Sequence, residues 1–342
     1  MSQSRFVPHP TRHAAHPGPR QALPRVLALL AACALGATAA TGHAQDFPQR
    51  AVRLVVPFPP GGATDGLARI LAQGLAASWG QQIVVDSRPG AGGNIAADIV
   101  ARTAPDGYTQ IMVGLNHAAN LSLYRKLNYH PLRDFTPITQ VVAIDTFLAV
   151  HPSLPVKSVQ ELLALARAKP GALNYASGGN GSSPHMAMEL FKSLTRADIV
   201  HVPYKGTESI TGLMRGEAAM IFENMISIGP AVKTGKLRVL AVGSPRRSTA
   251  MPQVPTVAES GVPGYSVTLW FGLLGPAAVP KAVVDKMHRD VVAVLKTPDV
   301  RERFTALGAE PVGSTPAEFE AFIRAEIGKW ETVIRGAGIQ VD

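Results

Sequence analysis

Residues 52–69, VRLVVPFPPGGATDGLAR, join a short apolar run to a helical pattern through a turn of prolines and glycines. The run at 52–58 is rich in β-branched residues and too short for a helix, which predicts a buried strand. Gly61 and Gly62 allow the chain to turn and leave the main chain open to a ligand. We expect Thr64 or Asp65 to cap the helix that follows. Because the first N–H groups of a helix lack partners within it, this stretch predicts a place that attracts an anion.

The same order of strand, glycine-rich loop and helix start occurs twice more. Residues 173–176 predict a strand that leads through the loop at 177–184 into a helix, and residues 199–202 predict a strand followed by the turn at 203–206. Along the whole chain, short β-branched runs alternate with helical stretches, which indicates α/β layers with mainly parallel strands. Because these potential anion-binding loops lie far apart in the sequence, they favour a cleft between two lobes.

Polar residues also follow other predicted strands. Asn116 and His117 come at the carboxyl end of a strand at 109–115, and Glu223 follows a strand at 218–222. Ligands of open α/β sheets gather at this end of the strands, which makes these side chains candidate contacts. For Asn116 and His117 the alternative is that they only cap the next segment.

The first 44 residues have the order of a secretory signal peptide. A basic segment with four arginines and no acid precedes an uncharged stretch at 26–41 and small residues up to Ala44. We expect cleavage after Ala44, with Ala39 as the alternative, and export to the periplasm. Cys33 lies in a sequence that resembles a lipoprotein cleavage box. A lipid-anchored cysteine is followed by a polar tether, whereas the residues after Cys33 are apolar, which argues against lipidation.

Composition and spacing argue against several classes of function. Loss of the signal peptide lowers the net charge from +9 to +5, because its four arginines are its only charged residues. The sequence contains no cluster of Lys and Arg with interleaved aromatic residues, which argues against binding of nucleic acid. The histidines after Ala44 show no paired metal spacing, and the glycines at 90–93 lack the third glycine of a dinucleotide fingerprint. We therefore expect no cofactor and no metal. An acid/base pair of Asp65 and Glu223 in a secreted hydrolase is the enzymatic alternative.

Several motifs in a fixed order resemble one protein family. They are VVPF at 55–58, PGG at 60–62 with Asp65 three residues on, RPGAGGN at 88–94, DGY at 106–108, GNGS at 179–182, HVPYKG at 201–206 and PQVPT at 252–256. Together they resemble the Bug family, the periplasmic solute-binding proteins of tripartite tricarboxylate transporters, over nearly the whole mature chain. In that family an Asp-Asn pair usually stands where this chain has Glu223-Asn224.

The resemblance implies a type II periplasmic binding protein fold, with two Rossmann-like domains and a ligand cleft between them. Residues 45–146 and 266–342 are expected to form the first domain, and residues 147–265 the second. The implied function is capture of a small carboxylate by a monomeric, non-enzymatic receptor for membrane transporter subunits; a receptor that serves a sensor is the alternative. The implied ligand contacts of the first domain are Phe58, Gly61, Gly62, Ala63, Thr64 and Asp65. Those of the second domain are Asn180, Gly181, Ser182, Ser183, Tyr204, Lys205, Gly206 and Thr207.

Overall fold

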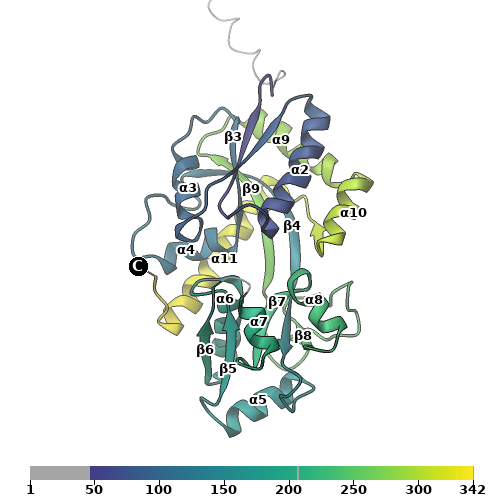
Figure 1. The fold of residues 1–342 in the computed structure, drawn as a ribbon. Coiled ribbons are helices and arrows are strands. Elements are labelled where there is room, and N and C mark those ends of the chain that lie inside the picture. The colour runs from purple at the N-terminus through teal and green to yellow at the C-terminus, as the bar shows by residue number, and fades with distance from the viewer. Residues whose placement is uncertain (1–46, 206–207, 342) are drawn as a thin grey trace, which may run out of the picture. The chain divides into compact units, whose positions relative to one another are not determined.

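Two long antiparallel strands, β4 (Phe135–Val150) and β9 (Thr268–Pro276), run through the centre of the fold (Figure 1). The computed structural model describes residues 47–205 and 208–341, and Pro48–Asp342 form one compact unit. The predicted signal peptide, including Cys33 and both cleavage positions, lies outside the described residues, as do the expected contacts Gly206 and Thr207.

Strand β4 belongs to both halves of the sheet. Phe135–Asp145 pair with β9, whereas Thr146–Val150 pair with β7 (Met220–Asn224) and β8 (Arg238–Val242). The apolar pattern of the sequence predicts two separate strands here, at 135–140 and 144–150, whereas the structure has one. That prediction was wrong, because bulges in the pairing with β9, between Pro137 and Thr139 and between Gln140 and Val142, absorb the break in the pattern.

The first lobe contains parallel strands joined to the two central ones. The strand order is β2-β1-β3-β9-β4, with β1 parallel to both β2 and β3, and β3 antiparallel to β9. Its other strands are β1 (Val52–Val56), β2 (Ile83–Ser87), β3 (Thr109–Gly114) and β10 (Ala309–Pro311). Its helices are α2 (Ala63–Trp79), the short 3₁₀ turn η2 (Ala91–Gly93), α3 (Asn94–Ala101), α4 (Leu115–Leu123), α9 (Lys281–Leu295) and α10 (Pro298–Ala306).

The second lobe repeats this construction around the other end of β4. Strand β5 is parallel to β6 and β7. Its strands besides β7 and β8 are β5 (Leu173–Ser177) and β6 (Ile199–Pro203). Its helices are α5 (Val159–Ala168), α6 (Ser183–Thr195), α7 (Glu208–Met214) and α8 (Met225–Lys233). The predicted two-lobed α/β fold is therefore confirmed.

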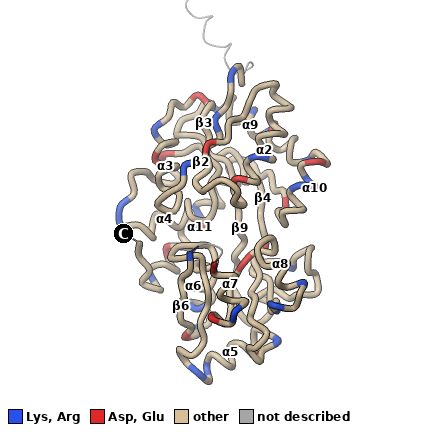
Figure 2. Tube along the Cα trace, viewed as in Figure 1, with Lys and Arg blue, Asp and Glu red and all other residues tan. Residues whose placement is uncertain are grey.

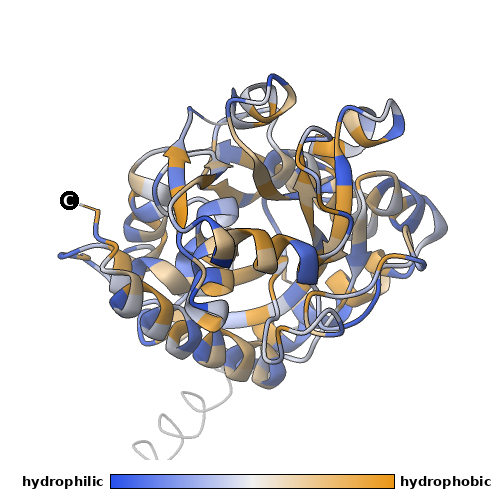
Figure 3. Ribbon diagram, turned by 90° about the horizontal axis from the view of Figure 1, so that it is seen from below, coloured by the Kyte–Doolittle hydropathy of each residue, from blue (hydrophilic) through white to orange (hydrophobic). Residues whose placement is uncertain are grey.

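The last helix, α11 (Pro316–Ala337), packs against α4 of the first lobe and α6 of the second. It begins with a capping box, in which Thr315 and Glu318 satisfy each other's backbone N–H groups. Its apolar side, which includes Phe319, Ile323 and Trp330, is buried. Figure 3 shows hydrophobic central strands surrounded by helices with alternating hydrophobic and hydrophilic residues. One face of α11 is thus buried against both lobes.

Candidate functional site

A cleft of about 450 Å³ lies where four strands reach their carboxyl ends. The segments that follow β1, β3 and β5, and the last residues of β7, all contribute to its wall. Strand β9 supplies the rest. The lining residues are Phe58, Gly62, Ala63, Thr64, Gly114, Leu115, Asn116, Gly178, Ser182, Ser183, Pro184, Glu223, Asn224, Ser227, Leu269, Trp270 and Phe271. This position is the one at which open α/β sheets bind ligands.

Four helices begin at the wall of this cleft. Their N-cap residues, all of which line it, are Gly62 of α2, Gly114 of α4, Ser182 of α6 and Asn224 of α8. The Asn224 side chain accepts the Ser227 N–H over 3.1 Å, whereas α2, α4 and α6 have no capping bond from the N-cap side chain. Three helix starts therefore bring unpaired N–H groups and the positive ends of their dipoles to one place.

Ser182 adds a hydroxyl to this group of donors. Its Oγ is buried and has no hydrogen-bond partner among the described residues. Buried hydroxyls without a partner are uncommon in folded proteins, and this one belongs to a residue that lines the cleft. The arrangement is suited to an anionic group that accepts several hydrogen bonds.

Glu223 is the one ionisable side chain among the described residues that line the cleft. Its Oε1 accepts hydrogen bonds from Asn224 N over 2.8 Å and from Asn224 Nδ2 over 2.7 Å. Burial raises the pKa of Glu223 to about 7, although the bond from the Asn224 backbone lowers it. At neutral pH this carboxyl is therefore partly protonated and adds less than a full negative charge to the site.

Asp65 lies beside the cleft and holds its loop in place. It is 4% exposed, and its Oδ2 accepts from Gly61 N over 3.0 Å and from Arg69 Nε over 2.9 Å. The hydrogen bond from Arg69 keeps the pKa of Asp65 below its ordinary value, so this carboxylate stays ionised. Neither Gly61 nor Asp65 belongs to the cleft lining. Helix α2 starts at Ala63 with Gly62 as its cap, so the prediction of Thr64 or Asp65 as the cap was wrong.

Asn116 and His117 lie in the first turn of α4 and face different surroundings. Asn116 lines the cleft, and its Nδ2 donates to the Gly181 carbonyl over 3.1 Å. His117 is buried with its Nε2 2.9 Å from the Pro131 carbonyl oxygen, and burial lowers its pKa to about 4. Consecutive residues of a helix point about 100° apart, so one side chain of the pair reaches the cleft and the other enters the core.

The glycine-rich loop of the second lobe contributes Gly178, Ser182 and Ser183 to the cleft, while Asn180 and Gly181 lie outside its lining. The turn after β6 also lies outside it at Tyr204 and Lys205. The Tyr204 hydroxyl is instead 3.3 Å from Glu217 Oε2. Of the predicted contacts, the structure brings Phe58, Gly62, Ala63, Thr64, Asn116, Ser182, Ser183 and Glu223 together.

Several lining residues had not been predicted. Gly114, Leu115, Gly178, Asn224 and Ser227 follow or end strands whose positions the sequence indicated, so the rule of carboxyl strand ends would have found them. The wall formed by Leu269, Trp270 and Phe271 carries no such signal, because these residues lie within an antiparallel strand. The Trp270 indole is held by Glu326 Oε2, which accepts its Nε1–H over 3.0 Å.

Other kinds of site find little support in the part of the chain that the structure describes. That part contains no cluster of three His, Cys, Asp or Glu side chains arranged to hold a metal ion. It also contains no helix of the length and hydropathy needed to cross a membrane. Figure 2 shows Lys and Arg interspersed with Asp and Glu along the chain.

Two lobes that share central strands, with a cleft at their facing strand ends, define a periplasmic binding protein fold. The family model described as tripartite tricarboxylate transporter family receptor matches residues 67–339. The chain belongs to this family, which confirms the resemblance to the Bug proteins. Protein BugT of Bordetella pertussis (strain Tohama I) is 38% identical over 306 residues, which are 89% of this chain and 94% of that protein.

Solved structures agree with this assignment. The Rpa4515 protein of R. palustris with adipate has a TM-score of 0.76 and 38% identity, covering 86% of this chain and all of that chain. MatC of Rhodopseudomonas palustris with bound malate has a TM-score of 0.72 and 34% identity, covering 84% of this chain and all of that chain. Periplasmic binding protein BugD has a TM-score of 0.73 and 30% identity, covering 86% of this chain.

Proposed function

We propose that this protein is a periplasmic receptor that captures a small carboxylate in its cleft and delivers it to the membrane subunits of a tripartite tricarboxylate transporter. The observation that carries the proposal is the convergence of four helix N-termini on one cleft, three of them without a side-chain cap. The related structures with adipate and malate support the same class of ligand. A volume of about 450 Å³ suits a small organic acid.

The carboxylate binds to main-chain amides at the starts of α2, α4 and α6 and to the Ser182 hydroxyl. A hydrogen bond to a charged group contributes roughly 1.5 to 3 kcal/mol, so three or four of them support micromolar affinity after the cost of ordering. The body of the ligand contacts Phe58, Leu115 and the β9 wall. Asn116 and Glu223 lie near the other polar groups of the ligand and select among them.

The two lobes close on this ligand as separate domains, with residues 45–146 and 266–342 in one and 147–265 in the other. The partners of β4 change between Asp145 and Thr146, and the return crossing lies near Val267, which supports these boundaries. Thr146 Oγ1 donates to the Val267 carbonyl over 2.8 Å, so the two crossing strands are bonded to each other. Rotation about these crossings opens and closes the cleft.

A binding screen tests the proposal. The protein, unfolded and refolded to remove any ligand carried through purification, is screened by thermal shift against mono- and dicarboxylates that include malate and adipate. Adipamide serves as the uncharged control for adipate. We expect at least one acid to raise the melting temperature and its amide to leave it unchanged, because a bound ligand stabilises only the folded state. Silence across the whole panel would contradict a carboxylate receptor, and loss of the acid on incubation would instead indicate an enzyme.

Delivery to a transporter needs a separate measurement. The measurement is a pull-down, in which the purified receptor is the bait and detergent-solubilised membranes of its own host are the sample. It is carried out with and without the acid that the screen identifies. Retention of the large membrane subunits of a transporter is the expected result. Retention of a sensor protein in their place would assign the same binding site to signalling.

A further inference from the structure

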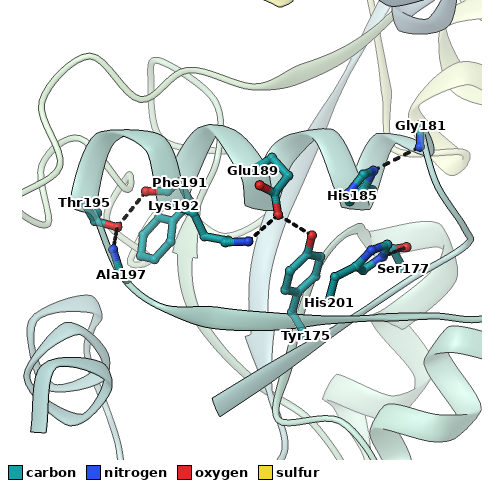
Figure 4. Close-up of polar contacts among 10 residues, drawn as sticks. All are labelled: Tyr175, Ser177, Gly181, His185, Glu189, Phe191, Lys192, Thr195, Ala197 and His201. Atoms are coloured by element: carbon teal, nitrogen blue, oxygen red, sulfur yellow. Dashed lines mark hydrogen bonds and ion pairs between the residues drawn. The ribbon is translucent and has the colours of Figure 1, made fainter. Parts of the chain in front are cut away.

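Two stacked imidazoles lie directly behind the glycine-rich loop that lines the cleft. The rings of His185 on α6 and His201 on β6 are 4.2 Å apart at their centroids and only 13° from parallel (Figure 4). The Tyr175 ring extends the stack, 4.7 Å from His201. His185 is 3% exposed, so its ring contacts protein on almost every side.

Each imidazole is bonded to the loop. His185 Nδ1 accepts the Gly181 N–H over 3.0 Å. His201 Nε2 lies 2.6 Å from Ser177 Oγ, which in turn accepts the Gly179 N–H over 3.1 Å. The loop is thus fixed at two glycines immediately before Ser182, where α6 begins and its amides reach the cleft.

The carbonyls of the loop accept other hydrogen bonds, from Ser182 N to Gly179 over 3.2 Å and from Asn116 Nδ2 to Gly181 over 3.1 Å. Gly179 and Gly181 have φ values of +111° and +75°, a region that residues with a side chain rarely adopt. Glycines add no side-chain contacts of their own, and they lose the most conformational freedom when a loop becomes ordered. Hydrogen bonds to their amides are therefore an effective means of holding the loop in one conformation.

The hydrogen bond from Gly181 requires an uncharged His185. An imidazolium has no lone pair with which to accept the Gly181 N–H, and two charged rings at this separation repel each other. Burial lowers the pKa of His185 to about 4 and also lowers that of His201. The charged groups beside the stack are Glu189 and Lys192, which are 2.7 Å apart and offset each other; Glu189 also accepts from the Tyr175 hydroxyl over 2.6 Å.

We propose that His185 and His201 are positioning residues for ligand capture, which fix the Ser177–Ser182 loop so that the start of α6 presents its amides and the Ser182 hydroxyl to the ligand. The affinity part of this proposal rests on the proposed carboxylate function, whereas the loop part does not. A purely structural stack would need only rings of the right size. Positioning needs a nitrogen or oxygen acceptor at the place of His185 Nδ1.

Matched substitutions separate these two roles. Asn carries its side-chain oxygen at the place of His Nδ1, so His185→Asn keeps the acceptor, and His185→Leu removes it; both lose the stacked ring. His201→Gln and His201→Leu form the same pair for the second histidine, because Gln keeps a polar group at the place of Nε2 that can bond to Ser177 Oγ and Leu does not. His151→Leu, on the polar turn after β4 where His151 bonds to Ser153, is the control for loss of a histidine elsewhere.

Amide hydrogen exchange and titration with malate and adipate are the two readouts. We expect exchange at Gly181 to become at least about tenfold faster in His185→Leu, with affinity for the bound acid about tenfold weaker, the effect of one hydrogen bond. His185→Asn should stay close to the wild type in both. Equal affinities in His185→Leu and the wild type, or equal losses in the Leu and Asn variants, would overturn the proposal. If neither acid binds the wild type, the proposed ligand class fails while Gly181 exchange still decides the loop.

Discussion

The side-chain amide of Asn116 in the first lobe donates a hydrogen bond to the Gly181 carbonyl of the second lobe over 3.1 Å. Gly181 also approaches the first lobe closely, because a Cβ built on it would lie 2.5 Å from Leu123 Cδ2. Its N–H is held by His185 behind it. One glycine thus joins the loop support of the second lobe to the cleft wall of the first.

Replacement of Asn116 by Ala tests this bond between the lobes. We expect affinity for the bound carboxylate to fall about tenfold, because the closed form loses one hydrogen bond and the Gly181 carbonyl loses its partner. The melting temperature without ligand should change little, since Asn116 lies at the cleft surface. Isothermal titration and thermal unfolding measure the two effects. Asn128→Ala, at an exposed position, is the control, and equal affinities of the two variants would exclude a role for Asn116.

Ser182 and Ser260 offer a contrast between binding and stability. Ser182 Oγ has no partner among the described residues, whereas Ser260 Oγ donates to the Thr256 carbonyl over 2.8 Å in the core. We expect Ser182→Ala to weaken carboxylate binding about tenfold without loss of stability, and Ser260→Ala to reduce the free energy of unfolding by about 1 kcal/mol with binding intact. Titration and urea unfolding of both variants provide the measurement. A stability loss in Ser182→Ala with unchanged affinity would contradict the assignment.

The sequence predicted those parts of the site that depend on local pattern. A short apolar run, a glycine turn and a helix start lie next to one another in the chain, so Gly62 and Ser182 were found without knowledge of the rest of the fold. Asn116 was found because it follows a predicted strand, although it lies inside helix α4, which starts at Leu115, and does not precede the next helix. Because consecutive side chains of a helix point in different directions, His117 enters the core while Asn116 faces the cleft.

Longer-range features could not be predicted in this way. The β9 wall of the cleft depends on antiparallel pairing of Trp270 with Ala143, which are far apart in the sequence. The length of β4 depends on bulges in its pairing with β9, which the residue pattern does not predict. The sequence is compatible with an Asp65 side chain that faces a ligand and with one that bonds to Gly61 and Arg69. The structure shows the second arrangement.

Trp270 is the basis of a stability prediction. Glu326 Oε2 accepts both the Trp270 and the Trp330 Nε1–H over 3.0 Å, and the carboxylate also pairs with Lys329. Glu326→Ala leaves two buried indole N–H groups without a partner, so we expect a loss of about 3 kcal/mol in the free energy of unfolding. Glu320→Ala, on the exposed side of α11, should change it by less than about 0.5 kcal/mol. Urea unfolding followed by tryptophan fluorescence measures both, and similar values for the two variants would contradict the argument.

Glu223 predicts how stability depends on pH. Burial raises its pKa from 4.5 to about 7, so between these values the folded chain holds a proton that the unfolded chain has released. The contribution of Glu223 to the free energy of unfolding is therefore largest below about pH 4.5 and is lost as the pH rises through 7. Glu223→Gln, which does not titrate, should lack this fall. Urea unfolding of both proteins between pH 4.5 and 8 provides the comparison, with the exposed Glu217→Gln as the control.

The same proton governs binding above neutral pH. An ionised Glu223 repels a carboxylate in the cleft, and the described lining residues include no Lys or Arg to pair with it. We expect the affinity of the wild type for its acid to fall by up to about tenfold per pH unit above pH 7, the limit for a single linked proton. Glu223→Gln should bind with an affinity that is independent of pH from 6 to 8.5, as measured by titration calorimetry. Parallel pH profiles for the wild type and Glu223→Gln would show that the ligand binds without sensing this carboxyl.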